Sequence, residues 1–482
     1  MQSLWIAFSA VYPQAFDEDF HFGLIRTYSH HWLPFLNAQP ANANAYGAVA
    51  RDPSFLYHYL MSFPYRIVNL FTDNLAVQVV SLRIINIAMF AAGIVLFRKL
   101  LLRVGLSQRL TNICLFVLVF IPIVPQLAGQ INYDNLLMPV TAWAMVLTLD
   151  LIDQLQRRQF SLQSLLKLAA VCLAATMIKY EFLPIFGSIG IFLAVMFWRQ
   201  FHSKWPDPKA LWTSYRHHPW TKKLVVLAAF VITLTMFVQR DVVNVIKYHD
   251  VAPDCGYVLS VEACSSYPVW IHDYISHQQV IGHSVSVSSN PVWYVWEWVY
   301  WLWYRLFFSI NGPVSGFTNY PPLPLPIACF GVLLIGSVFA IIKYRKMLFA
   351  GNPYFVFLGL TVVLYLLALL SQGFLKYRHT AVLELMNGRY LLPIFLPAAA
   401  VASTAIYRLV RNRPQLQTAL AAIVIACFLQ GGGVLTFISR SDASWYWDNQ
   451  FIRTMNTTAQ RVIRPIVFEG SKTYYTTKWF FN

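Results

Sequence analysis

Charged side chains are scarce in this chain of 482 residues. Asp, Glu, Lys and Arg together make up 12% of it, against roughly 25% in soluble domains. Acidic residues are fewer than basic residues, 20 against 36, which gives a net charge of +16. With 57% hydrophobic residues and a mean hydropathy of +0.52, the composition excludes a large soluble domain and predicts a polytopic membrane protein.

Several motifs of nucleotide and metal chemistry are also missing. The sequence has no Walker phosphate-binding loop, no GxGxxG leading into a helix, no HExxH and no CxxC pair. ATP hydrolysis, dinucleotide chemistry and zinc proteolysis therefore have no support. The basic excess does not indicate a nucleic acid partner, because most Lys and Arg lie in short loops between apolar runs, where they set membrane orientation.

The apolar runs predict an all-helical, single-domain membrane protein over residues 1–482 with about eleven transmembrane helices. The spans cover residues 76–97, 110–129, 136–152, 164–179, 183–198, 224–239, 326–343, 354–372, 390–409 and 416–437. Residues 1–15 are interpreted as the end of a further span, although they are few for a complete crossing. A cleaved signal peptide is the alternative, but no small-residue cleavage site precedes Asp17.

Basic residues in five loops predict the orientation of the spans. All five loops fall on one side, which the positive-inside rule makes cytoplasmic. The basic residues are Arg98, Lys99, Arg103 and Arg109; Arg157 and Arg158; Arg199, Lys204, Lys209, Arg216, Lys222 and Lys223; Lys343, Arg345 and Lys346; and Arg408, Arg411 and Arg413. The opposite side then holds two large extracytoplasmic loops, 16–75 and 240–325, and a short tail, 438–482.

The first large loop has the sequence pattern of a segment that lies at the membrane surface. Apolar side chains recur at helical spacing in 16–36 and predict an amphipathic interfacial helix. They are Phe20, Leu24, Tyr28 and Trp32. The aromatic stretch 55–71 contains a proline and predicts an interfacial or re-entrant segment.

The second large loop is rich in aromatic residues and contains two cysteines. The aromatic residues favour an interfacial anchor helix, or a platform for the hydrocarbon chain of a lipid substrate. They are Trp293, Tyr294, Trp296, Trp298, Tyr300, Trp301, Trp303 and Tyr304. Cys255 and Cys264 lie close together where a disulfide can persist, and the other four cysteines fall in spans as packed thiols.

An acidic cluster follows the apolar N-terminal segment. Asp17, Glu18 and Asp19 are followed by His21, and a carboxylate at such a place can take a proton from an attacking hydroxyl. Asp17 is the first catalytic candidate and Glu18 the second. Asp17 and His21, four residues apart, could also share a helix face and bind a divalent cation. The alternative is that Asp17 is a helix N-cap, with the other two acids favouring the positive helix end.

Basic groups near the same side are candidates for binding a lipid phosphate. Arg83 lies inside a span, where an ionisable residue suggests function, the alternatives being a snorkelling side chain or a helix–helix salt bridge. Further ionisable residues lie at the outer ends of spans: Asp134, Lys179, Glu181, Lys376, Arg378, His379 and Arg389. The converging basic groups could bind phosphate, with arginine favoured for its forked donors, and Arg389, Lys179, Arg378 and Asp134 join Arg83 as the candidates for that site. Each alone is typical of an interfacial residue.

Four stretches in this order resemble the GT-C superfamily of polytopic membrane glycosyltransferases, and especially bacterial membrane proteins allied to it. They are Asp17-Glu18-Asp19-Phe20-His21, Ser81-Leu82-Arg83-Ile84-Ile85-Asn86, Asn132-Tyr133-Asp134-Asn135-Leu136 and Asn387-Gly388-Arg389-Tyr390-Leu391-Leu392-Pro393. They span nearly the whole chain, but each motif is short. Two features depart from the family pattern: the first span is short, and the tail is smaller than the outer acceptor-binding domain of many members.

The resemblance implies a glycosyltransferase of the bacterial cytoplasmic (inner) membrane. Its donor would be a sugar on a polyprenyl phosphate or diphosphate, with an unknown acceptor at the extracytoplasmic face, among membrane lipids. The role of base falls on Asp17, or alternatively Glu18, and Arg389 and Arg83 would contact the carrier phosphate. Some members bind a divalent cation such as Mg²⁺ or Mn²⁺ and others need none.

Two other function classes stay open at the level of sequence. A transporter or flippase for a lipid-linked sugar would use the same basic and aromatic groups without bond cleavage, and it should place polar residues deep within several spans. A structural partner in envelope synthesis predicts that Asp17, Arg83 and Arg389 do not lie near one another.

Overall fold

A computed structural model of the chain describes residues 1–15, 17–36, 38–202, 219–288, 290–307, 310, 324–429 and 432–465, without side chains at 307 and 324–330. Within these residues the regular secondary structure is helical, apart from one isolated bridge between Ala10 and Tyr446. Outside the described part lie Phe16 before the acidic cluster, three basic residues of the third predicted cytoplasmic loop (Lys204, Lys209 and Arg216), and much of the tail.

Seven helical segments in the described part are long and apolar enough to cross a membrane, which makes the chain a multi-pass membrane protein. They are α4 (Leu75–Arg103), α7 (Asp134–Gln156), η3 with α9 (Tyr180–Phe201), α11 to α12 (Trp220–Tyr248), α18 (Pro353–Thr380), η5 with α19 (Gly388–Val410), and α20 to α21 (Pro414–Arg440). The shorter apolar helices α5 (Gln108–Phe120) and α8 (Leu162–Ile178), and the 26-residue α17 (Pro324–Phe349), lie at other predicted spans.

Two of the predicted spans differ from the helices that form. Residues 2–9 form α1 (Gln2–Ser9), whose eight residues rise about 12 Å, too little for a crossing. The span 110–129 divides into α5 and α6 (Ile123–Ala128). The break falls at Pro122, because proline lacks the N–H that continues a helix and holds the preceding Ile121 in an extended conformation.

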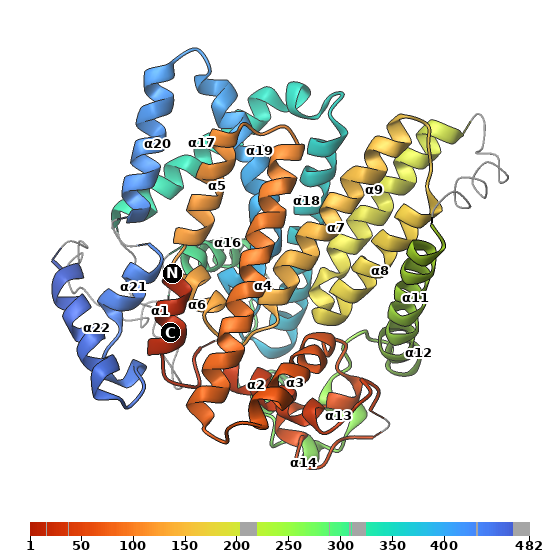
Figure 1. Cartoon of the computed structure of the whole chain (residues 1–482), viewed down its shortest axis with the longest axis vertical. Helices are drawn as coiled ribbons and strands as arrows, with labels where there is room; N and C mark the ends of the chain where they lie inside the picture. The colour runs from red at the N-terminus through yellow and green to blue at the C-terminus, as the bar shows by residue number, and fades with distance from the viewer. Residues whose placement is uncertain are drawn as a thin grey trace.

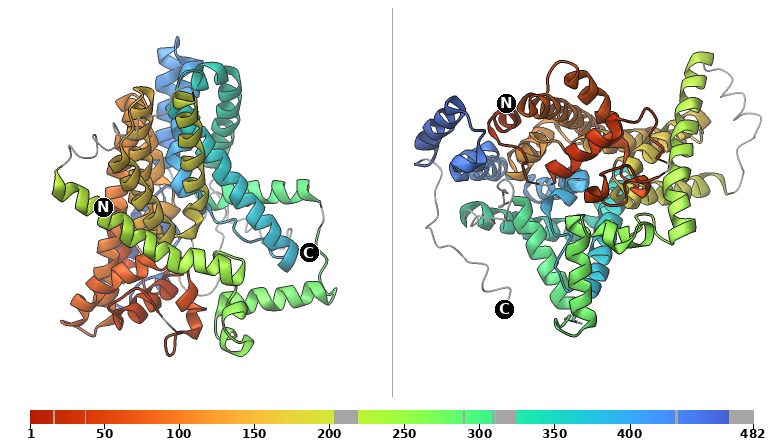
Figure 2. Two further views of the ribbon diagram at one scale, coloured as in Figure 1. Left: turned by 90° about the vertical axis from the view of Figure 1, so that its right-hand side faces the viewer. Right: turned by 90° about the horizontal axis from the view of Figure 1, so that it is seen from below.

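Four of the helix connections that carry the predicted cytoplasmic basic loops, α4 to α5, α7 to α8, α17 to α18 and α19 to α20, gather at one end of the bundle, the top in Figure 1. The opposite end is covered by α2 (Glu18–Ser29), α3 (Leu56–Asn69), α13 (Cys255–Val258) and α14 (Val261–Cys264). We call this the α2 end. In the left view of Figure 2, α15 (Pro268–Ile281) and α16 (Pro291–Phe307) run across the direction of the long helices.

The predicted amphipathic helix over 16–36 is shorter than expected, with one face packed into the protein and Asp19 and Arg26 exposed on the other. It ends at Ser29, so Trp32 falls outside it and is 77% exposed. Leu24 and Tyr28 are almost completely buried, because α2 packs along α3. The aromatic stretch 55–71 forms that partner helix.

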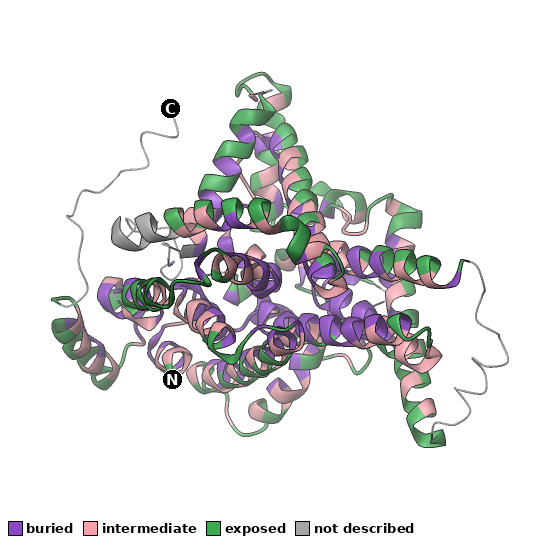
Figure 3. Cartoon of the chain, turned by 90° about the horizontal axis from the view of Figure 1, so that it is seen from above, coloured by how far each residue is buried: buried purple, intermediate pink, exposed green. Residues whose placement is uncertain are grey.

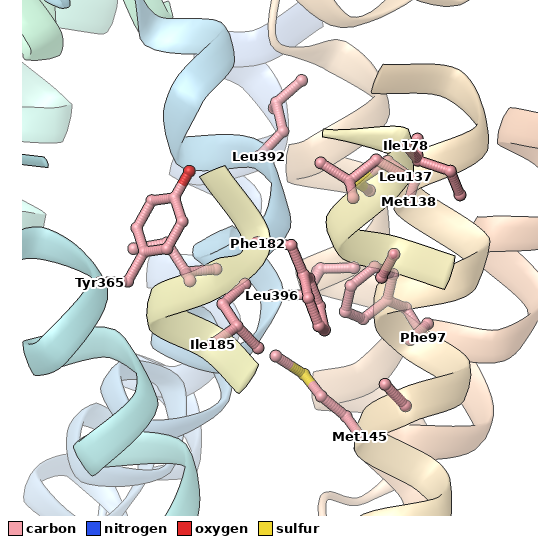
Figure 4. Packing of buried hydrophobic residues seen from close by; sticks show 14 of the residues in the cluster. Phe97, Leu137, Met138, Met145, Ile178, Phe182, Ile185, Tyr365, Leu392 and Leu396 are labelled. Carbon is pink, nitrogen blue, oxygen red and sulfur yellow. The ribbon is translucent and has the colours of Figure 1, made fainter. Parts of the chain in front are cut away.

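The core lies where the long helices meet, as Figure 3 shows by the buried residues at the centre of the bundle. Phe97 of α4, Met145 of α7, Phe182 and Ile185 at the start of α9, and Leu396 of α19 interdigitate there (Figure 4). In contrast, α11 exposes large apolar side chains along its length, with Val225 67% exposed. That pattern suits a helix in contact with lipid. The tight core keeps the ends of α4, α7, α8 and α19 in register.

Small residues let these helices approach closely. A Cβ placed at Gly93 of α4 would lie 3.1 Å from the Cβ of Met138 and 3.1 Å from the backbone nitrogen of Pro139, both in α7. Because lipid removes much of the hydrophobic drive for association, such close backbone packing is a main source of helix–helix stability. This contact holds the spans that carry Arg83 and Asp134 side by side.

Candidate functional site

The two adjacent acids at the start of α2 point to different partners. Asp17 occupies the N-cap position of α2, but its backbone is left-handed (φ 66°, ψ 32°) and its side chain makes no capping hydrogen bond. Aspartate is one of the few residues that adopts this conformation without glycine's freedom. The N-cap interpretation is thus correct for the position of Asp17 but not for its side chain, which is free to reach another element.

Glu18 is fully buried against Arg83 of α4. Arg83 Nε donates to Glu18 Oε1 at 2.8 Å and Arg83 Nη2 to Oε2 at 2.6 Å. The remaining lone pairs of the carboxylate accept from the backbone N–H groups of Gln14, at 2.8 Å, and Ile131, at 3.0 Å. Two charges so deep in the protein are stable only with such complete pairing.

The guanidinium of Arg83 is equally saturated. Its Nη1 donates to the carbonyl oxygens of Ala7, at 3.1 Å, and Ala10, at 2.6 Å, and its Nη2 donates to that of Val11 at 3.3 Å. All five N–H donors of an arginine are therefore used within the protein. Arg83 and Glu18 do not fit the phosphate-binding and catalytic roles expected of them, and the helix–helix salt bridge describes Arg83 correctly.

Asp17 meets Arg389 instead, 372 residues later in the chain. Arg389 Nη2 donates to Asp17 Oδ2 at 2.9 Å. The arginine side chain is only 9% exposed, whereas the carboxylate is 55% exposed. The pair therefore joins a buried, fixed cation to an acid that water or a substrate can reach.

The short 3₁₀ helix η5 (Gly388–Leu391) sets the position of Arg389. The side chain of Asn387 caps it by accepting from the backbone N–H of Arg389 at 3.1 Å. Gly388 lies directly against α16, since a Cβ there would be 2.3 Å from the Cα of Leu306. Only glycine fits this contact, which explains the Asn-Gly-Arg order of the motif.

A second buried ion-pair group lies at the ends of α7 and α8. Lys179 Nζ is 2.9 Å from Asp134 Oδ1 and 3.0 Å from Glu181 Oε2. The side chains of Lys179 and Asp134 are 3% and 5% exposed. The ammonium also lies 4.7 Å from the ring centre of Tyr133 and 4.8 Å from that of Tyr390, positions at which aromatic faces stabilise a cation.

These two groups form one site at the α2 end. Tyr390 contacts Lys179 and follows Arg389 directly in the chain, and both cations act on the same aromatic neighbour, Tyr133. We call Asp17, Asp134, Lys179, Glu181 and Arg389 the charge cluster. Four of these five residues were binding or catalytic candidates from sequence, and the fold brings all five together from α2, α7, η3 and η5, with Lys179 at the end of α8.

Two buried histidines lie beside Asp17. His21 Nδ1 is 2.9 Å from His58 Nε2, and the rings are stacked with centres 5.2 Å apart. The ring of Tyr133 meets His21 edge-on at 4.5 Å. Burial lowers the pKa of His58 to about 3, and burial, helped by His58, Arg389 and Lys179, holds the pKa of His21 well below its usual value. With both pKa values below their usual range, both imidazoles are neutral at pH 7, and in the hydrogen bond between them one ring nitrogen donates and the other accepts.

Asp17 and His21, the residues expected to hold a metal, each have a partner in the protein: His21 Nδ1 faces His58, and Asp17 is paired with Arg389. His21 Nε2 has no hydrogen-bond partner among the described residues, so a divalent cation at these two residues stays a prediction. Among the described residues, the one group of three possible ligands within 4.8 Å of one another is His272, Asp273 and Glu384. There the ammonium of Lys376 already contacts both carboxylates, so this group ties α15 to α18 as an ion-pair network.

The histidine pair predicts a pH dependence of stability. In the unfolded chain both histidines take up a proton as the pH falls through about 6.5, but in the folded state they stay neutral down to the depressed pKa of about 3 at His58. The unfolded state binds more protons in this window, so stability falls with decreasing pH, by up to about 1.4 kcal/mol per pH unit for each histidine. Thermal unfolding in detergent between pH 7 and 4 measures this slope.

Replacing His58 by Gln keeps a polar partner for His21 and removes one titrating group. The part of the slope of stability against pH that comes from the histidine pair should then fall by about half, one histidine of the two, and the same change at the exposed His30 is the control. An unchanged slope in the His58→Gln variant would contradict a neutral, buried pair.

Arg378, the remaining candidate for binding phosphate, does not join the charge cluster. It is exposed near the end of α18, and the adjacent Lys376 carries the ion pairs of that turn. The orientation of α18 explains why Arg378 is exposed, because the helix buries Gly373 and Tyr377 and turns Arg378 outward.

The predicted disulfide between Cys255 and Cys264 is present. It joins α13 to α14, directly before Tyr267, whose ring stacks on Phe20 of α2 with centres 6.0 Å apart. Cys114, Cys172 and Cys427 are buried thiols, as expected, and the side chain of Cys329 lies outside the described part. The disulfide loop thus covers the first turn of α2, next to Asp17.

Two further features were missed or only partly anticipated. Arg240, at the π-helical turn η4 (Val238–Val242), is fully buried and donates to the carbonyls of Val49, Asp52 and Pro34 at 3.0–3.1 Å, which fastens the first loop to α11.

The aromatic helix α16 is two-sided: Tyr294, Trp298 and Trp301 are buried against the bundle, whereas Trp296 is 70% exposed. His58 gave no sequence signal, because it lies within an aromatic run.

Comparison with protein-family models, with curated proteins and with solved structures finds no match to this chain. The chemistry of the site is therefore inferred from its own residues.

Proposed function

We propose that the chain is a glycosyltransferase that moves a sugar from a polyprenyl-phosphate-type lipid to an acceptor hydroxyl, with the α2 end facing outward from a bacterial cytoplasmic membrane. The observation that carries the proposal is the pair between the exposed carboxylate of Asp17 and the buried guanidinium of Arg389. Acid–base chemistry needs an accessible carboxylate, and a departing phosphate needs a fixed cation. The pair supplies both at one point.

The proposed reaction is a single displacement with inversion. The acceptor oxygen forms a bond to the anomeric carbon, and the bond from that carbon to the lipid phosphate oxygen breaks, the phosphate leaving with the electron pair. Asp17 takes the proton of the acceptor hydroxyl. Arg389, with Lys179 behind it, stabilises the charge that develops on the phosphate. When the phosphate binds Arg389, Asp17 loses its ion-pair partner and becomes available as the base.

The fold supports the proposal in its general layout. A GT-C-like architecture would have about eleven crossings, with the α2, α3, α15 and α16 helices at the outer interface. Seven long apolar helices are consistent with such a layout. Each step proposed above is carried by a protein side chain, and a divalent cation such as Mg²⁺ or Mn²⁺ at Asp17 and His21 stays a prediction.

The placement of charge favours an enzyme over a transporter. In the described part, the two fully buried arginines, Arg83 and Arg240, are engaged by protein acceptors rather than facing a passage. The charge cluster lies at the helix ends. A structural partner needs no convergence of Asp17 and Arg389, whereas their side chains meet at 2.9 Å.

The direct test is a panel of lipid-linked sugars. Purified protein in proteoliposomes is incubated with polyprenyl phosphates and diphosphates that carry radiolabelled sugars, and with bacterial envelope lipid and polysaccharide fractions as acceptors. The proposal expects label to move to an acceptor fraction with loss of the glycosyl–phosphate bond. Label that crosses the bilayer on an intact lipid would overturn it in favour of a flippase.

A further inference from the structure

A cavity of about 240 Å³ lies at the α2 end, between the start of α9, the middle of α18 and the segment after α12 (Val243–Tyr248). Its polar lining consists of Tyr180, Glu181, Asp250, Tyr365 and Gln372. The rest of the wall is apolar and includes Leu183, Ala368 and Leu369. Asp17 is not among the lining residues, so this cavity is separate from the half-exposed carboxylate itself.

The cavity is nevertheless joined to the charge cluster by two contacts. Glu181 belongs to both, since it lines the cavity and lies 3.0 Å from Lys179. Tyr365 lines the cavity and donates its hydroxyl to the carbonyl oxygen of Tyr390 at 2.7 Å, one residue from Arg389. A molecule in the cavity would therefore lie next to the cations that we assign to the lipid phosphate.

The size and the lining of the cavity suit a single small ring. Pockets for drug-sized ligands measure about 300–1,000 Å³, and this one is smaller. The lining combines apolar side chains with hydroxyl, amide and carboxylate groups, and Gln372 Nε2 donates to the Tyr180 hydroxyl at 3.2 Å. A pyranose or furanose ring likewise combines an apolar face with polar edges.

The charges of the lining favour a cationic ligand. Two carboxylates line the cavity, and none of its lining residues is Lys or Arg. Glu181 is compensated by Lys179. Asp250 is exposed and, among the described residues, has no ion-pair partner, its Oδ1 accepting only from the backbone N–H of Ala252. A uronic acid would place a third negative charge here, whereas an ammonium group would pair with Asp250.

We propose that this cavity is the glycosyl subsite of the transferase and that the sugar it takes carries a free amino group. The inference rests on the proposed function, which places the lipid phosphate at Arg389. The ammonium of the sugar pairs with Asp250, and its hydroxyls bond to Gln372, Tyr180 and Glu181.

Monosaccharide binding tests the subsite without any transfer reaction. The full chain in detergent micelles is titrated with glucosamine, N-acetylglucosamine, glucose and glucuronate, and binding is followed by saturation-transfer NMR. An ion pair with an exposed carboxylate is weak, so glucosamine should bind about fivefold more tightly than the other three. Asp250→Asn should abolish that preference. Asp448→Asn, at an acid that is 92% exposed and outside the lining, should preserve it.

A second variant distinguishes loss of the binding site from loss of the folded state. Ala368→Phe fills the cavity from its apolar wall and should remove binding of all four sugars while the size-exclusion profile stays that of the native protein. Glucuronate that binds as tightly as glucosamine, or an Asp250→Asn variant that keeps the preference, would overturn the proposal.

The proposed transferase activity and the proposed glycosyl subsite can be disproved independently of each other. If lipid-linked sugars are transferred but no monosaccharide prefers the cavity, the glycosyl subsite is wrong and the enzyme stands. If glucosamine binds through Asp250 but no lipid-linked sugar reacts, the cavity remains an amino-sugar site, and its assignment as a transferase subsite falls with the transferase.

Discussion

Replacing Asp17 by Asn is expected to lower glycosyl transfer by about 10²–10⁴-fold, the usual contribution of a general base. Asparagine has nearly the same shape and can still accept a hydrogen bond from Arg389, but it cannot take a proton from the acceptor. Because the carboxylate is 55% exposed, its loss should cost little stability. The measurement is the rate of label transfer from the reactive member of the lipid-linked panel, at equal amounts of folded protein.

Asp19 provides the matched control. It lies two residues further along the same helix turn, is exposed, and among the described residues is in no ion pair. Asp19→Asn should therefore transfer sugar at the native rate. If Asp17→Asn also retains turnover, Asp17 is not the base and the proposed mechanism is wrong.

Removing the guanidinium of Arg83 is expected to destabilise the protein by about 3–5 kcal/mol, the cost of leaving one partner of a buried ion pair uncompensated. In Arg83→Ala, the Glu18 carboxylate stays buried without its cation, and the carbonyls of Ala7, Ala10 and Val11 lose their donor. The free energy of unfolding can be measured in mixed micelles by denaturant titration.

This variant also separates two interpretations of Arg83. An exposed pair, Arg453 with Asp448, serves as the comparison, and Arg453→Ala should change stability by no more than about 1 kcal/mol. A stable Arg83→Ala protein with a raised KM for the lipid donor would instead show that Arg83 contacts the carrier phosphate, contrary to the saturated geometry described above.

The acidic cluster shows which part of the site could be predicted from the sequence. Asp17 and Glu18 are neighbours of the same chemical type, and their order along the chain does not say which one is buried. Asp17 has a left-handed backbone at the N-cap and Glu18 is the first residue of the helix, so one acid meets η5 and the other meets α4. That division became visible only when the helices were packed, because it depends on where Arg83 and Arg389 lie in space.

The metal and phosphate expectations show the limit of reasoning from spacing. His21 is four residues from Asp17, as a shared helix face requires, but its Nδ1 faces His58 of α3, which leaves only Nε2 for a ligand. Arg378 has the same charge as Arg389 and lies in the same predicted loop, yet α18 turns it outward. Spacing along the sequence describes one element, whereas the surroundings of both residues depend on how that element packs in the protein.

The sequence by itself determined that the chain crosses a membrane many times, that its basic loops share one end, and that Cys255 can reach Cys264. Each of these properties is local: a sum of side-chain transfer energies over one helix, or a short loop between two thiols. Only the tertiary structure decided that Glu18 neutralises Arg83, that Asp17 opposes Arg389, and that a small polar cavity adjoins Lys179 through Glu181. Those pairings join residues up to 372 positions apart, and they depend on how whole helices pack, which no local pattern encodes.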